Sequence, residues 1–142
     1  MKNILLVDTG FWIALINQSD QHHKRAVEFL TDCPVPLITT WLVLAETYHL
    51  LFKRVGVATQ LQFIDSLRRS GVALYSLSPS DLSRLHELMN KYADLPMDLA
   101  DGSLVILAEV QGQGRILSTD QRDFQTYRWK NHQPFENLLL PD

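Results

Sequence analysis

The sequence NILLVDTG, residues 3–10, contains a short apolar run that stops abruptly at Asp8. A continuous run of Ile, Leu and Val is typical of a strand that is buried on both faces of a sheet. Residues 11–16 follow with the apolar spacing of a helix. This succession of strand, acidic turn and helix predicts the first unit of an α/β fold.

Candidate strands and helices continue to alternate along the chain. Short apolar runs typical of strands lie at residues 37–38, 72–77, 116–118 and, at the expected sheet edge, 135–139. Helical spacing covers residues 26–30, 41–54, 58–69, 79–92 and 99–110, with Gly56 near a helix end. The alternation predicts a three-layer α/β/α sandwich with a short, mostly parallel central sheet, formed by one domain over residues 1–142.

Composition limits the classes of protein that this chain could be. Its 142 residues are 46% hydrophobic, enough to bury one sizeable core, and its formal net charge of −3 does not attract a polyanion. A nucleic-acid partner would need a local basic strip or a bound metal. The single cysteine, Cys33, cannot close an intrachain disulfide, and the run at residues 3–7 is too short for a signal peptide or a membrane span. We therefore expect a soluble, cytoplasmic protein.

Three acidic residues occupy positions that need explanation. Asp8 and Asp120 each follow an apolar strand candidate, and ligands of open parallel sheets bind beyond the carboxyl ends of the strands. A helix cap or turn explains either aspartate alone equally well. Glu46 lies inside a strongly apolar helix, so it needs a partner or a position at the rim of the core, unless it shares a solvated stripe with His49 and Lys53.

Asp98 and Asp101 are three residues apart at the start of a predicted helix. One interpretation makes both of them a capping pair, with Asp98 as the N-cap residue. The other keeps Asp101 as an acid that faces inward and leaves Asp98 as a cap or an outer partner.

Asp8, Glu46, Asp101 and Asp120 come from four separate segments, with Asp98 and Asp123 close to two of them in sequence. Two carboxylates about 4 Å apart repel by on the order of 4 kcal/mol at an effective dielectric constant near 20. A converging cluster therefore needs protons or a divalent cation. Because the candidate ligands are hard oxygens, with no histidine or cysteine set at zinc spacing, the sequence favours Mg²⁺ or Mn²⁺.

The same segments resemble a known family. The motifs are LLVDT at residues 5–9, LAE at 44–46, MDLADGS at 97–103 and ILSTDQRDF at 116–124. Together they resemble a PIN domain, and most of all the VapC-type toxins of toxin-antitoxin systems. The resemblance covers nearly the whole chain in the expected order, and the final Thr-Asp-x-x-Asp-Phe pattern is its most specific part.

The resemblance implies a metal-dependent endoribonuclease. Asp8, Glu46, Asp101 and Asp120 would bind Mg²⁺ or Mn²⁺, and Thr9 and Thr119 match hydroxyl positions beside the metal or the scissile phosphate. Asp123 would support the fourth acid, with Phe124 packed beneath it. The family implies an RNA substrate, an antitoxin partner and a homodimer. Two departures are that both Asp98 and Asp101 are present and that Gly102 replaces a common alanine.

Three other interpretations remain open. The triplet Asp8-Thr9-Gly10 also occurs in aspartic proteases, but those are nearly all β, whereas a helix follows Gly10 here. A PIN-like module could bind RNA or a protein without cutting, although such a module would be expected to lack some of the acids. A third possibility is a PIN nuclease of RNA processing that has no antitoxin.

Overall fold

The structure is a computed structural model that describes residues 3–32 and 34–141. Its helices and strands in chain order are β1 (Leu5–Val7), α1 (Thr9–Ile16), α2 (His23–Asp32), β2 (Leu37–Thr40), α3 (Trp41–Arg54), α4 (Val57–Ser70), β3 (Ala73–Tyr75), a 3-10 turn (Pro79–Asp81), α5 (Leu82–Lys91), α6 (Leu99–Gln111), β4 (Arg115–Leu117), α7 (Gln121–Thr126), β5 (Arg128–Trp129), β6 (Gln133–Pro134) and β7 (Glu136–Asn137). Cys33, for which no disulfide was expected, lies outside the described residues.

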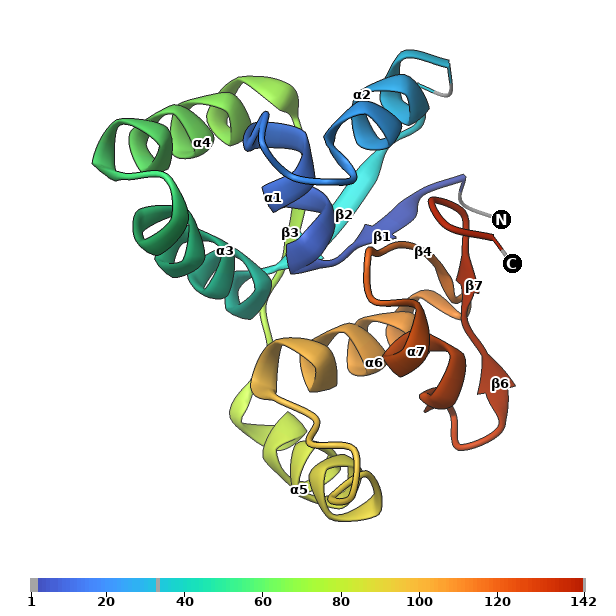
Figure 1. The fold of residues 1–142 in the computed structure, drawn as a ribbon. Helices are drawn as coiled ribbons and strands as arrows, with labels where there is room; N and C mark the ends of the chain where they lie inside the picture. Colours follow the sequence, from blue (N-terminus) through green and yellow to red (C-terminus); the bar gives the residue numbers. More distant parts are fainter. Residues whose placement is uncertain (1–2, 33, 142) are drawn as a thin grey trace.

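The central sheet has the strand order β3-β2-β1-β4-β7, and every pair in it is parallel. Helices α1 to α4 gather on one side of this sheet, while α5 and α6 lie on the other (Figure 1). The predicted three-layer α/β/α sandwich is confirmed. The expected edge strand is present as β7, although it is only two residues long.

The core is built around β1, the middle strand. All three of its residues are buried, as the uninterrupted apolar run predicted. Helix α6 covers the sheet with an almost wholly buried segment, and its last turn ends at Gly112 in the left-handed conformation, with φ 67°. That backbone conformation suits glycine because a Cβ would be strained there.

Three boundaries differ from the sequence-based expectations. Gly56 serves both helices: its amide donates to Leu51 O at the end of α3, and with φ 131° it is the N-cap residue of α4. The helix expected over residues 79–92 begins as a 3-10 turn and ends at Lys91. The strand expected over 72–77 is shorter, because only Ala73–Tyr75 pair with β2. None of the described helices is long and apolar enough to cross a membrane.

Candidate functional site

One open cavity of about 270 Å³ lies at the carboxyl ends of β1 and β4. Every residue that the sequence singled out for the site lines it: Asp8, Thr9, Glu46, Asp98, Asp101, Thr119, Asp120 and Asp123. The chain thus brings together residues up to 115 positions apart, which are carried by four different segments. The remaining lining consists of Gly10, Ile13, Leu50, Arg54 and Pro96.

Asp8 is placed by the pairing of the two middle strands. Val7 is in register with Leu117, so Asp8 and Ser118 leave the sheet as neighbours. Ser118 Oγ donates to Asp8 Oδ2 at 2.8 Å and accepts the amide of Asp120 at 2.9 Å. Asp8 Oδ1 accepts the amide of Thr9 and caps α1. Ser118, which the sequence analysis did not select, is therefore the hydroxyl that joins the two strand-end acids.

Thr119 lines the cavity and also limits what can stand at position 10. A Cβ on Gly10 would lie 1.9 Å from Thr119 Oγ1 and 3.2 Å from its Cβ. Both distances are below van der Waals contact, so the start of α1 can approach the β4 turn this closely only with glycine.

Glu46 has the partner that its apolar surroundings require. Helix α3 begins after Thr40, whose side chain caps it, and Glu46 lies on the face that turns toward α1. There Thr9 Oγ1 donates to Glu46 Oε1 at 2.6 Å. His49 and Lys53 are exposed, and neither lines the cavity. The rim position is the correct interpretation, rather than the solvated stripe.

The pair at the start of α6 divides into two different roles. Asp98 is exposed and its Oδ1 accepts the amide of Asp101 at 2.8 Å, which makes it the N-cap residue. Asp101 is half-buried and its Oδ2 accepts a hydrogen bond from Tyr127 Oη at 3.0 Å. The geometry agrees with the interpretation in which Asp101 faces inward and Asp98 caps the helix.

The pair at the start of α7 repeats this local geometry. Asp120 Oδ1 accepts the amide of Asp123 at 3.1 Å, and Asp120 is the exposed member. Asp123 lies deeper, with 13% of its side chain exposed, and its buried Oδ1 has no hydrogen-bond partner. The nearest cationic atom is Nε of the exposed Arg122, at 3.5 Å. Phe124, the residue after Asp123, is buried.

The acids shift one another's proton affinities. Burial raises the pKa of Asp8 to about 7, and the charges of Glu46 and Asp120 raise it further against two hydrogen bonds that lower it. Burial and the neighbouring charge of Asp8 raise the pKa of Asp101 to about 8. Burial, followed by the interaction with Asp120, raises the pKa of Asp123 to about 6. Close carboxylates in a partly desolvated cavity favour a bound proton or a cation.

The chemistry of the donors fits a hard divalent cation. The acidic residues that line the cavity offer carboxylate oxygens, and one of these, the buried Oδ1 of Asp123, has no hydrogen-bond partner. Within residues 3–32 and 34–141, no three acidic, histidine or cysteine side chains surround one point closely enough to hold an ion as they stand. Side chains would therefore have to turn toward an ion, and the cap bonds of Asp98 and Asp120 are exposed enough to allow such a turn.

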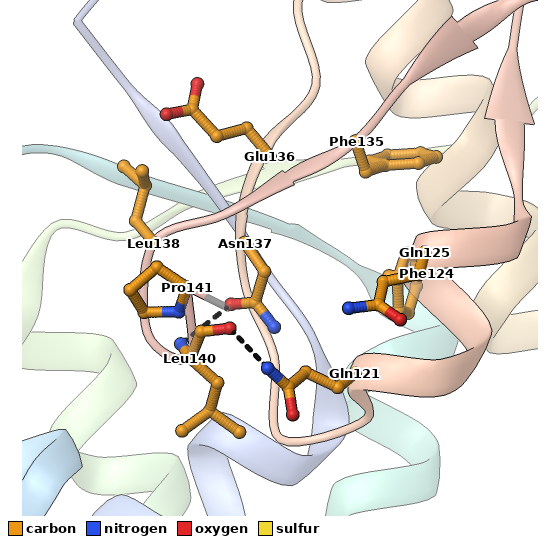
Figure 2. A pocket seen from close by; sticks show the side chains of 9 residues that line it. All are labelled: Gln121, Phe124, Gln125, Phe135, Glu136, Asn137, Leu138, Leu140 and Pro141. Carbon is orange, nitrogen blue, oxygen red and sulfur yellow. Dashed lines mark hydrogen bonds between the residues drawn. The ribbon is translucent and has the colours of Figure 1, made fainter.

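The backbone of Ser118 is held by a residue that lines a second pocket. This pocket has a volume of about 260 Å³ and lies on the other side of α7 (Figure 2). Asn137 lies at its centre and clamps the Ser118 backbone: Nδ2 donates to Ser118 O at 2.9 Å, and Oδ1 accepts from Ser118 N at 3.3 Å. The same Oδ1 accepts the amides of Leu139 and Leu140. Asn137 therefore fixes, through Ser118, the segment that holds Asp8.

Comparison with known proteins identifies the family. The model of the PIN domain family matches residues 5–130. The chain belongs to the PIN domain family. One relative is the ribonuclease VapC26 of Mycobacterium tuberculosis, which is 25% identical over 124 residues, 87% of this chain and 92% of the relative. The 23S rRNA-specific endonuclease VapC20 of the same species is 40% identical over 53 residues, 37% of this chain and 40% of that protein.

Two solved structures share the PIN fold with this chain. Crystalline VapC20 of Mycobacterium tuberculosis, described as a toxin that cleaves the sarcin-ricin loop, has a TM-score of 0.75 at 22% identity, over 83% of this chain and 90% of that one. VapBC2 of Rickettsia felis, solved with a DNA fragment from its promoter, has a TM-score of 0.61 at 15% identity, over 94% and 98%. These two structures confirm the fold, and the sequence relatives VapC26 and VapC20 confirm the resemblance to VapC proteins.

Proposed function

We propose that this PIN domain protein is a Mg²⁺- or Mn²⁺-dependent endoribonuclease and the toxin of a toxin-antitoxin pair. The observation that carries the proposal is the convergence of all eight selected residues on one acidic cavity. The similarity to the ribonuclease VapC26, which extends over 92% of that protein, supports the ribonuclease assignment.

Asp8, Glu46, Asp101 and Asp120 are the proposed catalytic residues and metal ligands, supported by Asp98, Asp123, Thr9 and Thr119. A bound divalent cation would lower the pKa of its water and offset the charge that develops on the phosphate. The carboxylates themselves would orient that centre, because Ser118 fixes one oxygen of Asp8 and Thr9 fixes one oxygen of Glu46.

The phosphate backbone of the RNA must approach a negatively charged opening. Arg54, at the end of α3, is the basic side chain among the described residues that line the cavity. It is exposed, and Lys53 precedes it in the same helical turn. We assign Arg54 the role of contacting a substrate phosphate next to the acids, since a guanidinium donates to phosphate oxygens in a planar pair of hydrogen bonds.

The test is cleavage of a folded total-RNA pool that includes 23S rRNA, by the wild type and by Asp8→Asn, in Mg²⁺, Mn²⁺ or EDTA. Asparagine preserves the size of Asp8. Its Oδ1 can still accept the Thr9 amide, while its Nδ2 can only donate to Ser118 Oγ, so that the second hydrogen bond is reversed. Asp65→Asn is the matched control, because Asp65 is an acid on the surface of α4 that pairs with Arg68 and Arg69.

Discrete cuts, mapped at their 5′ ends, should appear with the wild type and with Asp65→Asn and should disappear with EDTA or with Asp8→Asn. Cuts that survive EDTA would refute metal dependence. RNA binding without any cuts would instead indicate a non-catalytic PIN module.

The proposed protein partners are an antitoxin and a second copy of this chain. An apolar pocket of about 200 Å³ between α3, α4 and β3 supports the homodimer, and Trp41 at its edge is 56% exposed. Sedimentation equilibrium should give a dimer for the wild type and a monomer for Trp41→Ser. A nuclease that is monomeric, and that needs no coexpressed neighbour for its host to survive, would indicate RNA processing rather than a toxin.

A further inference from the structure

Tyr127 connects the two helices that carry the paired aspartates. It follows α7 directly, and its backbone amide donates to Asp123 O at 2.9 Å. Its hydroxyl crosses to α6 and donates to Asp101 Oδ2 at 3.0 Å. Tyr127 is completely buried, although its polar end reaches a residue that lines the acidic cavity.

The ring of Tyr127 is held by aromatic neighbours on two sides. Its centroid lies 5.0 Å from that of Tyr92 and 5.2 Å from that of Phe124, in edge-to-face geometry in both cases. Tyr92 and Phe124 are themselves buried. A ring that is packed in this way cannot swing aside, so its hydroxyl has a fixed position relative to Asp101.

The two hydrogen bonds that reach Asp101 act on different parts of the residue. Asp98 Oδ1 accepts the Asp101 amide and thereby fixes the backbone. Tyr127 engages the carboxylate itself, through Oδ2. A carboxylate that is held by one oxygen presents the other to a ligand at a lower entropic cost than a freely rotating one.

We propose that Tyr127 is a positioning residue, which holds Asp101 Oδ2 so that Oδ1 is directed to a divalent cation in the cavity and thereby sets the affinity for that cation. This inference rests on the proposed metal-dependent function. It assigns a role to a buried residue, distant in sequence from α6, that no acidic motif contains.

Tyr92 supplies a matched control for the packing role of a buried tyrosine. Its hydroxyl accepts the backbone amide of Arg128 at 2.9 Å, and its ring belongs to the same aromatic group. Tyr92→Phe therefore removes a buried hydroxyl and one hydrogen bond without touching an acid. A purely structural role for Tyr127 predicts that Tyr127→Phe and Tyr92→Phe behave alike.

The experiment titrates Mn²⁺ into the full-length wild type, Tyr127→Phe and Tyr92→Phe, and measures unbound Mn²⁺ by electron paramagnetic resonance. In Tyr127→Phe the dissociation constant should rise about tenfold, the effect typical of residues that orient metal ligands. In Tyr92→Phe it should stay within about twofold of the wild type. The melting temperatures without metal should fall by similar amounts in the two variants.

RNA cleavage over a range of Mn²⁺ concentrations provides the second readout. Tyr127→Phe should need about tenfold more Mn²⁺ for half-maximal rate and should recover a near wild-type rate at saturation. Equal Mn²⁺ affinities in Tyr127→Phe, Tyr92→Phe and the wild type would overturn the inference and leave the proposed function intact. A wild type that binds no Mn²⁺ would overturn both.

Discussion

Helices α6 and α7 begin with the same pattern, an aspartate followed three residues later by a second aspartate. The two helix starts also have the same capping geometry. In each, the outer acid caps its own helix and the inner acid lies deeper against the cavity. The difference lies in the inner acids. Asp101 receives a hydrogen bond from Tyr127, whereas the buried Oδ1 of Asp123 has no hydrogen-bond partner.

The capping pattern fixes which acid faces inward, and under the proposed ligand set it does not fix which acid binds the cation. On α6 the proposed metal ligand is the inner acid, Asp101. On α7 it is the outer acid, Asp120. The two helices should therefore respond in opposite ways when their acids are replaced one at a time.

The largest expected effect is on α6. Asp101→Asn should lower kcat/KM by about 10³-fold, because it removes a charge aimed at the reacting centre. Asp98→Asn should cost about tenfold or less, since asparagine is an equally good N-cap residue. Single-turnover cleavage of a mapped RNA measures both effects. The reverse order would make Asp98 the ligand.

The second prediction concerns α7. Asp120→Asn should lower cleavage about 100-fold, whereas Asp123→Asn should lower it about tenfold. Asp123→Asn should also raise the melting temperature in EDTA, because it removes the charge of a largely buried carboxylate whose Oδ1 has no hydrogen-bond partner. If Asp123→Asn is the more damaging change, both helices use their inner acid and the proposed ligand set is wrong at Asp120.

The third prediction is a pH dependence of stability in EDTA. Burial in the folded protein raises the pKa of Asp8 to about 7 and that of Asp101 to about 8, from the ordinary aspartate pKa of 3.8. The folded state therefore binds more protons between these values, and stability falls as pH rises from about 4 to 8. The melting temperature should drop by several degrees between pH 5.5 and pH 8.

Millimolar Mn²⁺ should restore the melting temperature at pH 8, because a ligand of the native state adds stability. The inner acids can be told apart in this scan. Asp123→Asn should flatten the curve mainly below about pH 6, and Asp101→Asn should flatten it up to about pH 8. A melting temperature that climbs with pH in EDTA would contradict the raised pKa values.

The smallest effects are expected at the buried residues that follow each inner acid, Gly102 and Phe124. A Cβ on Gly102 would meet Leu85 Cδ2 at 2.9 Å, so Gly102→Ala loses in packing about what it gains in helix propensity, within about 1 kcal/mol. Phe124→Leu should keep cleavage within about tenfold. Chemical unfolding and kinetics measure both variants. A larger loss of cleavage at unchanged stability would give Phe124 a role in the site.

The sequence predicted the fold well where a pattern has a local cause. The apolar run at residues 5–7 is typical of a doubly buried strand, and seven of the eight selected residues mark strand ends and helix starts, whereas Glu46 lies inside α3. The sequence patterns did not predict α7 or the small β5-β6 hairpin, because a six-residue helix and two-residue strands are too short to show periodicity.

The supporting residues of the site were harder to find. Ser118 could have been selected, since it is a hydroxyl residue directly after a buried strand and two positions before Asp120. Tyr127 and Asn137 give no such signal: each reaches the site across a tertiary contact, to Asp101 or to Ser118. Sequence patterns report local geometry, whereas these roles depend on how α7 and β7 pack against distant segments.

The hydrogen bond between Ser118 and Asp8 joins residues 110 positions apart. During synthesis on the ribosome, at about 5–20 residues per second, Asp8 is made roughly 5–20 s before its partner. The middle strand, β1, cannot pair on one side until β4 has been made. Asn137, which holds the Ser118 backbone, is made later still. A ribosome-bound chain that stops before β4 therefore has only one of the two strands that flank Asp8, and the cavity cannot form. The topology delays the appearance of a complete site until the chain has been translated through β7.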